Sequence, residues 1–179
     1  MKTNQIGRSM VEIIGVLAII GVLSVGAIAG YASAMEKQRW NAFTNGVNHL
    51  IMSATEISAN QKSTDRIDII PLLKQTNQMP APFAAQNSVV NQQQLFYKGY
   101  FTYAYLYSKD SAIILETHGL QTKICEKILT EPWDNLDLDK GIMLVGSPNK
   151  TFKTKPTMEE ANTYCKNASR VDLRFKMLR

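Results

Sequence analysis

At 179 residues, the chain is long enough for one ordinary domain with an additional element and too short for two large domains. Its 20 basic and 15 acidic residues give a net charge of +5, which favours acidic partners only weakly because both signs are spread along the chain. Hydrophobic residues make up 45% of the total but are unevenly distributed: Glu12 is the only charged residue between Met10 and Ala34, whereas charged and polar residues are dense after Met35. The sequence therefore predicts an apolar rod followed by a water-soluble body.

The uncharged stretch from Ile13 to Ala34 is long enough to cross a membrane, since a helix of about 20 residues spans the apolar core. One interpretation is a secretory signal, with Lys2 as its positive charge and Ala32-Ser33-Ala34 as its cleavage site, although such apolar cores usually run about 7–15 residues. A second interpretation is a single membrane anchor. This leaves Glu12 unexplained, because a carboxylate in the apolar layer costs about 2.5–3.5 kcal/mol.

A third interpretation supplies a partner for Glu12. The run Gly7-Arg8-Ser9-Met10-Val11-Glu12 resembles the motif of type IV prepilins, in which a short polar leader ends in glycine and a glutamate stands fifth after the cleavage point. The resemblance implies that residues 1–7 are a leader, removed by a prepilin peptidase that also methylates the new amino terminus at Arg8. It further implies that residues 8–34 remain as a transmembrane and assembly helix, and that Glu12 neutralises the terminal amine of a neighbouring subunit. Arg8 departs from the family, whose first mature residue is usually apolar.

Four glycines, Gly15, Gly21, Gly26 and Gly30, lie within the apolar stretch. Each costs about 0.8–1 kcal/mol relative to alanine in a helix interior. Gly26 and Gly30 have the small-xxx-small spacing that lets two membrane helices approach closely, and Gly21 falls where many type IV pilins have a glycine that loosens the helix. We expect these glycines to serve helix packing or local unwinding in a filament; the alternative is that an apolar membrane helix tolerates them.

Residues 35–62 predict an amphipathic continuation of the same helix, unbroken to about Gln61. Its apolar stripe recurs at steps of three and four and comprises Trp40, Phe43, Val47, Leu50, Ile51, Ala54 and Ile57. Residues 63–94 are rich in Gln, Asn, Ala and Pro and show no lasting periodicity, which predicts an exposed variable loop.

Residues 95–179 predict an antiparallel sheet with short helices. Phe101, Tyr103, Tyr105 and Tyr107 alternate with smaller side chains, and a second run at 111–117 follows a turn at 108–110, which is typical of a β-hairpin. The aromatic row could stack on single-stranded nucleic acid, but cross-strand packing is the expected role. Further along, residues 121–129 predict a helix, 141–146 a buried strand, 157–160 a capping box opening a second helix, and 170–177 a half-buried strand with a mostly basic outer face.

Cys125 and Cys165 are the only cysteines, and their state depends on the compartment. A leader and a membrane segment would place the chain after about residue 35 on the trans side, where disulfides persist, whereas a cytosolic body would keep two free thiols. A bridge would close a loop of about 40 residues and contribute about 4 kcal/mol in the chain-entropy model. The pair also resembles the C-terminal disulfide region of type IV pilins. The helices around it and the final strand resemble class IVb, whereas the short leader resembles class IVa.

The sequence contains no pattern of catalytic residues. His49 and His118 are expected to lie apart from any cysteine or carboxylate pair, and there is no phosphate-binding glycine loop, serine nucleophile motif or CxxC. The acidic run from Asp134 to Asp139 lacks the glycine and the terminal glutamate of an EF-hand loop, so a solvated turn is expected there. We therefore expect no enzymatic activity, no cofactor and no metal.

The expected fold is α+β, with a long N-terminal helix whose second half packs on an antiparallel sheet, as in the pilin fold. The resemblance implies a structural subunit of a type IV pilus, anchored in the inner membrane with its body in the periplasm and later assembled into an extracellular homo-oligomeric filament. Its implied partners are the prepilin peptidase, the pilus assembly machinery and the inner membrane. A DNA or surface ligand is left open, as is the choice among adhesion, motility, DNA uptake and conjugation. Two alternatives also remain open: a pseudopilin of a type II secretion system, and a soluble binding protein released after Ala34.

Overall fold

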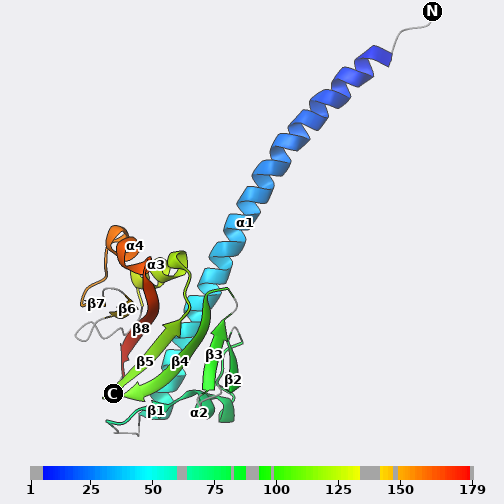
Figure 1. The fold of residues 1–179 in the computed structure, drawn as a ribbon. Coiled ribbons are helices and arrows are strands. Elements are labelled where there is room, and N and C mark those ends of the chain that lie inside the picture. Colours follow the sequence, from blue (N-terminus) through cyan, green and yellow to red (C-terminus); the bar gives the residue numbers. More distant parts are fainter. Residues whose placement is uncertain are drawn as a thin grey trace, which may run out of the picture. The chain divides into compact units, whose positions relative to one another are not determined.

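The computed structural model describes residues 6–59, 64–81, 83–87, 93–97, 99–133, 142–146 and 149–177, as shown in Figure 1. The chain divides into two compact units, Met1–Phe43 and Thr44–Arg179. Among the described residues, the first unit consists of the beginning of one helix, and the second contains the end of that helix and every other element.

The long N-terminal helix is α1 (Ile6–Ser58), which is continuous over 53 residues. The predicted unbroken helix is therefore observed, with bounds that differ slightly at both ends. It begins at Ile6, before the expected start after Gly7, and ends at Ser58 rather than near residue 61. The continuity has a simple cause: despite its glycines, no proline interrupts the segment, and proline is the residue that breaks a helix interior.

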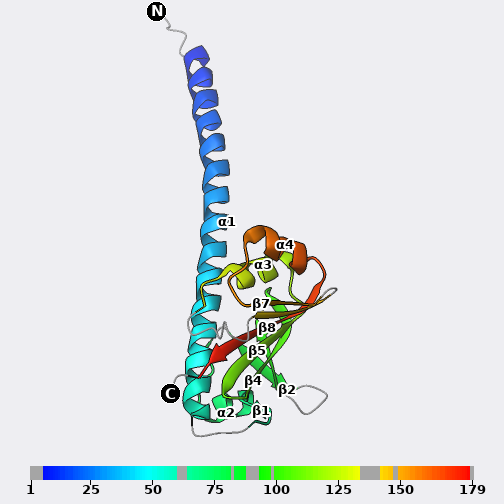
Figure 2. The same ribbon diagram turned by 90° about the vertical axis from the view of Figure 1, so that its left-hand side faces the viewer.

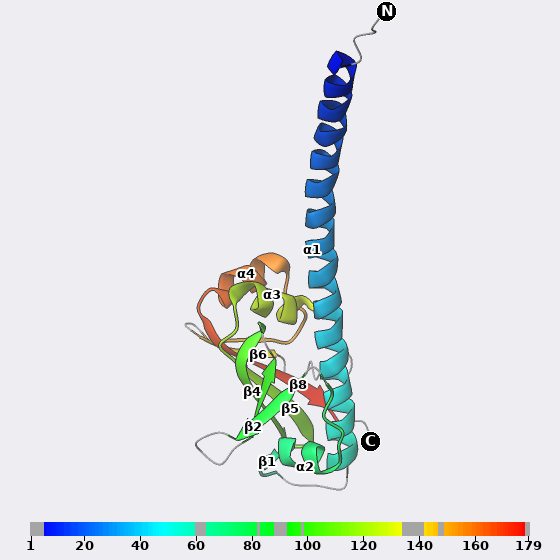
Figure 3. The ribbon, with the colours of Figure 1, turned by 90° about the vertical axis from the view of Figure 1, so that its right-hand side faces the viewer.

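The second half of α1, from Thr44 to Ser58, supplies one wall of the core of the C-terminal unit. Val47, Leu50, Ile51 and Ala54 are each at most 5% exposed, and they recur at the predicted steps of three and four. Figures 2 and 3 show this part of α1 lying along one face of the sheet. The predicted packing of an amphipathic half-helix on a sheet is confirmed for these residues.

The sheet is antiparallel throughout. Its strands follow the order β2-β3-β4-β5-β8-β6-β7, and β1 pairs with β4. The last strand of the chain therefore lies inside the sheet, between β5 and β6. The strands are β1 (Ile67–Asp68), β2 (Ala84–Asn87), β3 (Gln93–Tyr97), β4 (Phe101–Lys109), β5 (Ala112–His118), β6 (Ile142–Gly146), β7 (Lys150–Phe152) and β8 (Ala168–Lys176).

The predicted hairpin is formed by β4 and β5. Its turn lies at Asp110 and Ser111, with φ angles of 50° and 58°, rather than at residues 108–110. Two consecutive residues with positive φ are typical of a two-residue hairpin turn, whose backbone twist matches that of the strands. Neither residue is a glycine, so the positive φ angles carry a conformational cost, and the sequence gives no glycine from which the turn could be predicted.

The two faces of the sheet differ in chemistry because side chains directly opposite one another on neighbouring strands point to the same side. The face toward α1 is apolar: Leu106, Leu115 and Leu173 form one row across β4, β5 and β8, and each is at most 1% exposed. Among the described residues, Figures 2 and 3 show no helix over the opposite face of β4 and β5. We call that opposite side the outer face.

Residues 63–94 differ from the expected exposed loop in the part that the structure describes. They contain β1, β2, the beginning of β3 and the short helix α2 (Ile70–Gln75). Ile69, Ile70, Leu73 and Phe83 are buried. Pro71 does not break α2, because it stands in the first turn, where no backbone N–H is needed.

Two short helices complete the C-terminal unit. They are α3 (Thr122–Thr130) and α4 (Met158–Cys165). The predicted capping box is confirmed, since the hydroxyl of Thr157 accepts from the backbone N–H of Glu160 and the Glu160 carboxylate accepts from the backbone N–H of Thr157. The α+β class with an antiparallel sheet is observed; the closer likeness to the pilin fold stays a prediction.

Candidate functional site

The first half of α1 is apolar around its whole circumference. Its large side chains between Met10 and Tyr31 are 52–75% exposed. A helix that is hydrophobic on every side needs lipid or other apolar helices around it. By length and composition, α1 is the one helix among the described residues that could cross a membrane.

Glu12 is the single carboxylate on this apolar surface, and its side chain is exposed in the isolated chain. Among the side chains from residue 10 onward that the structure describes, none forms an ion pair with Glu12. Gly7 and Arg8, the predicted cleavage pair, both lie in the first turn of α1. Residues 1–5 of the predicted leader fall outside the described residues.

The apolar half of α1 also contains the four glycines and a serine. A Cβ placed on Gly15, Gly21, Gly26 or Gly30 would have no neighbour within 4 Å. Their predicted role in packing against another helix is therefore not tested by a single chain. The hydroxyl of Ser24 donates to the carbonyl of Ile20 at 2.7 Å, so this polar group is satisfied inside its own helix, as a membrane interior requires.

A disulfide joins Cys125 of α3 to Cys165 of α4, with 5.7 Å between the Cα atoms, and both residues are buried. The predicted pairing is confirmed. A hydrogen bond of 2.8 Å from the Asn162 amide to the Glu126 carboxylate links the same two helices. The bridge therefore links the helix that follows β5 to the helix that precedes β8.

The outer face of the sheet carries four rows of side chains, set by the register of β4, β5 and β8, and the last of them is Lys109, Ala112 and Lys176. The first row is Tyr103, His118 and Arg170; the second is Tyr105, Glu116 and Asp172; the third is Tyr107, Ile114 and Arg174. Met143 of β6 extends the second row. The predicted aromatic row thus stands beside acidic and basic residues from two other strands.

Four of these residues form a charge cluster together with Arg66, which precedes β1. The cluster is defined as Arg66, Glu116, His118, Arg170 and Asp172. Arg170 lies 2.9 Å from the Asp172 carboxylate and 3.4 Å from that of Glu116. His118 Nε2 lies 2.8 Å from Glu116 Oε1, and Arg66 lies 3.9 Å from Glu116 Oε2. The side chains of Glu116 and Asp172 are only 9% and 7% exposed. The two acids are therefore buried beneath the cations that balance them.

Burial raises the pKa values of two side chains on the outer face, Asp172 and Tyr107. It raises the pKa of Asp172 to about 6, with the nearby Glu116 adding to the effect and Arg170 opposing it. Burial also raises the pKa of Tyr107 to about 12, again with help from Glu116 and Asp172. The Tyr107 hydroxyl donates to Glu116 at 3.3 Å, and the guanidinium of Arg66 lies 3.8 Å above the Tyr107 ring.

The expectation that His118 lies apart from a carboxylate pair is wrong. Glu116 and Asp172 are direct cross-strand partners, and His118 contacts Glu116. The local signal for this arrangement is the alternation Glu116-x-His118 and Arg170-x-Asp172, which puts each pair on one side of its strand. His49 is exposed on α1. The acidic run Asp134–Asp139 lies outside the described residues.

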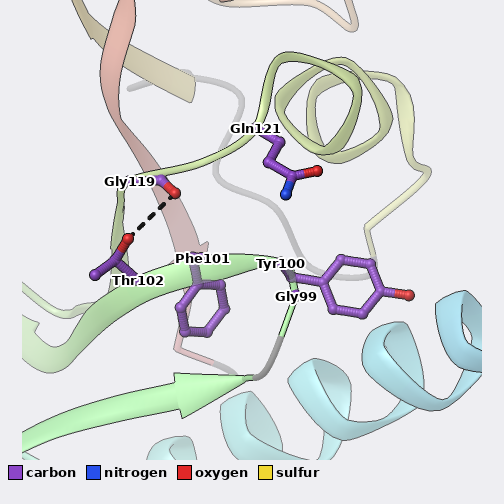
Figure 4. Close-up of a pocket in the computed structure, with 6 residues that line it drawn as sticks. All are labelled: Gly99, Tyr100, Phe101, Thr102, Gly119 and Gln121. Carbon is purple, nitrogen blue, oxygen red and sulfur yellow. Dashed lines mark hydrogen bonds between the residues drawn. The ribbon is translucent and has the colours of Figure 1, made fainter.

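A hollow of about 190 Å³ lies beside the start of β4. Figure 4 shows its lining residues, which are Gly99, Tyr100, Phe101, Thr102, Gly119 and Gln121. Gly119 has a φ of +66°, and a Cβ there would collide with the Thr102 hydroxyl oxygen. That hydroxyl donates to the Gly119 carbonyl at 3.5 Å. None of the six lining residues is charged, and we assign the hollow no function.

The described part of the chain contains no group of three or more His, Cys, Asp or Glu side chains placed to hold a metal ion. The chain matches no known protein family, no curated protein and no solved structure.

Proposed function

We propose that the chain is a structural subunit of a type IV pilus, held in the inner membrane by the first half of α1 and then assembled into a filament through the same surface. The observation that carries the proposal is the all-round apolar, exposed helix with one carboxylate, Glu12, near its beginning. Such a surface has to be covered by lipid before assembly and by neighbouring helices afterwards. In the filament, Glu12 pairs with the amino terminus of a neighbour, which removes the cost of a lone carboxylate in an apolar layer.

The body supports the same proposal. The disulfide between Cys125 and Cys165 suits a periplasmic or extracellular location, and its place near the C-terminus resembles the disulfide region of type IV pilins. Pseudopilins typically lack such a pair, so the disulfide favours a pilus subunit. Release after Ala34 is disfavoured, because α1 runs without interruption through this position into the core of the body. The partners proposed are further copies of the chain, the prepilin peptidase, the assembly machinery and the inner membrane.

The mature amino terminus tests the processing step. Mass spectrometry of the protein purified from cells that carry a type IV prepilin peptidase is expected to show a chain beginning at Arg8. Methylation of its amine would add further support. A chain that begins at Met1 or at Met35 would contradict the proposal.

Replacing Glu12 with alanine tests assembly. The variant is expected to accumulate in the membrane fraction like the parent, because an alanine makes the segment more apolar, and to yield no sheared filaments in electron micrographs. Glu56→Ala is the matched control, since Glu56 is an exposed glutamate on the second half of α1; it should assemble normally. Normal filaments from Glu12→Ala would rule out the assembly mechanism.

A further inference from the structure

We propose that the outer face of the sheet binds single-stranded nucleic acid, with bases stacking on Tyr103, Tyr105 and His118 and phosphates meeting Arg66 and Arg170. This binding does not depend on filament assembly. It requires an open sheet face with accessible rings and accessible positive charge.

The first requirement is an uncovered surface. The second half of α1 covers one face of β4 and β5, and Figures 2 and 3 show no helix of the described part of the chain over the other. Tyr107 and Ile114, in the third row, are buried on this side, so the accessible part lies at the first and second rows. Tyr103, Tyr105 and His118 are half-buried there rather than enclosed, and Met143 at the end of the second row is 40% exposed. An open sheet with aromatic side chains on its surface is the platform on which RNA-recognition motifs stack two or three bases.

The second requirement is a continuous group of aromatic rings. Tyr103 and Tyr105 are neighbours on one side of β4, with ring centroids 5.7 Å apart. His118 of β5 stacks on Tyr103 at 4.6 Å and meets Tyr105 edge-on at 5.8 Å. The side-chain amide of Gln94 donates to the Tyr105 hydroxyl at 2.8 Å, which holds that ring in place. Rings that are already ordered lose little rotamer freedom when a base stacks on them.

The third requirement is charge complementarity to a polyanion. In the charge cluster, the side chains that solvent reaches best are the two arginines: Arg66 is 37% exposed and Arg170 28%, whereas Glu116 and Asp172 are at most 9% exposed. A third acid nearby, Asp68, turns its carboxylate to the backbone N–H groups of Ile70 and Gln93. The net charge of +5 adds a long-range attraction for a polyanion.

Cross-strand packing explains the contacts among the rings, but it does not require cations to be the accessible charges beside them. Binding measurements on the full-length protein in a non-ionic detergent separate the two roles. Fluorescence anisotropy with labelled dT15 and rU15 at low salt is expected to show saturable binding of one or both oligonucleotides, and their ratio identifies DNA or RNA as the preferred source. Failure of the parent protein to bind either would overturn the proposal.

The aromatic contribution is tested with Tyr103→Ala and Tyr105→Ala. Each is expected to weaken binding by about 5- to 150-fold, the range found for the loss of one stacked base. Tyr103→Phe and Tyr105→Phe keep the rings and should retain binding. Urea midpoints of the alanine variants close to that of the parent would show that their loss of binding is not due to unfolding. Tyr164→Ala, on α4 away from this face, is the matched control and should bind like the parent. Equal binding by folded alanine variants would overturn the proposal.

The charge contribution is tested with Arg66→Gln, chosen because Arg66 is the most exposed cation of the cluster. Removing one phosphate contact on a single strand should reduce the slope of log K against log salt by about 0.7. Lys153→Gln, an exposed lysine elsewhere, should leave the slope unchanged. Heparin is the competing polyanion without bases. If it bound as tightly as dT15, and its affinity were unchanged in Tyr103→Ala, the protein would bind polyanions in general and the stacking mechanism would be overturned.

Discussion

Asp172→Asn is expected to flatten the pH dependence of the stability of the C-terminal unit. Asp172 is buried on the outer face beside Arg170 and Glu116, and burial raises the pKa of its carboxyl from 3.8 to about 6. Between these two values the folded protein holds a proton that the unfolded chain releases. The free energy of unfolding must therefore rise as the pH falls through this window.

The size of the effect follows from linkage. At about pH 5 the carboxyl is mostly protonated in the folded state and mostly ionised in the unfolded chain, so this one group should make the protein about 1 kcal/mol more stable than at pH 7.5. Asparagine has a similar shape and cannot titrate, so this contribution disappears in the variant. Burial also raises the pKa of Asp68, which adds to stability at low pH, but it does so equally in both proteins and cancels in the comparison.

Urea denaturation of the full-length protein in a non-ionic detergent measures the effect. Trp133 is buried against Phe175 in the C-terminal unit and provides the fluorescence signal. The parent should gain about 1 kcal/mol more than Asp172→Asn between pH 7.5 and 5, at equal denaturant slopes. Glu56→Gln, at an exposed carboxylate, should behave like the parent. The same gain in parent and Asp172→Asn would refute the assignment of the titration to this residue.

Three further predictions concern the backbone and the disulfide. Ser111→Gly should raise the free energy of unfolding by about 1 kcal/mol, because φ is 58° at this position and glycine adopts that conformation without cost; a loss of stability would contradict the described turn. Gly119→Ala should lower it by more than about 1 kcal/mol, since φ is +66° and the new Cβ meets Thr102, and an unchanged urea midpoint would be inconsistent with this close approach. Replacing Cys125 and Cys165 together with serine should cost about 4 kcal/mol for a loop of 40 residues. Treatment of the parent with a reductant should lower the urea midpoint similarly, and no change in either case would argue against the bridge.

Features with a local physical cause could be predicted from the sequence. The apolar run and the stripe through Val47, Leu50 and Ala54 require only hydrophobic periodicity, and α1 has both. The capping box at Thr157 depends on residues three apart, and it forms as predicted. The β4–β5 hairpin also follows from alternation. The predicted position of its turn is wrong, because Asp110 and Ser111 adopt positive φ angles although neither is a glycine.

Features that depend on distant pairing could not be predicted. Glu116 and Asp172 lie 56 residues apart in the sequence and become neighbours only because β5 and β8 pair in one particular register. A shift of one residue in that register would turn one acid to the apolar face, and no local pattern specifies it. The burial of Phe83 and Leu73 has the same origin, since composition predicts a loop while packing in the C-terminal unit encloses both side chains.

Glu12 and Asp172 differ in where the partner that compensates the carboxylate comes from. Asp172 has its partner, Arg170, two residues away on the same strand, so this ion pair lies within the folded body. For Glu12, the proposed partner is the amino terminus of another copy of the chain, so its charge would act in assembly. The two residues lie in different compact units, and substitutions at sites that share no contacts usually have additive effects. Glu12→Ala should therefore abolish filaments without moving the urea midpoint of the body, whereas Asp172→Asn should alter the pH dependence of unfolding without affecting assembly. A variant that changed both properties would show that the assembly surface and the body are coupled.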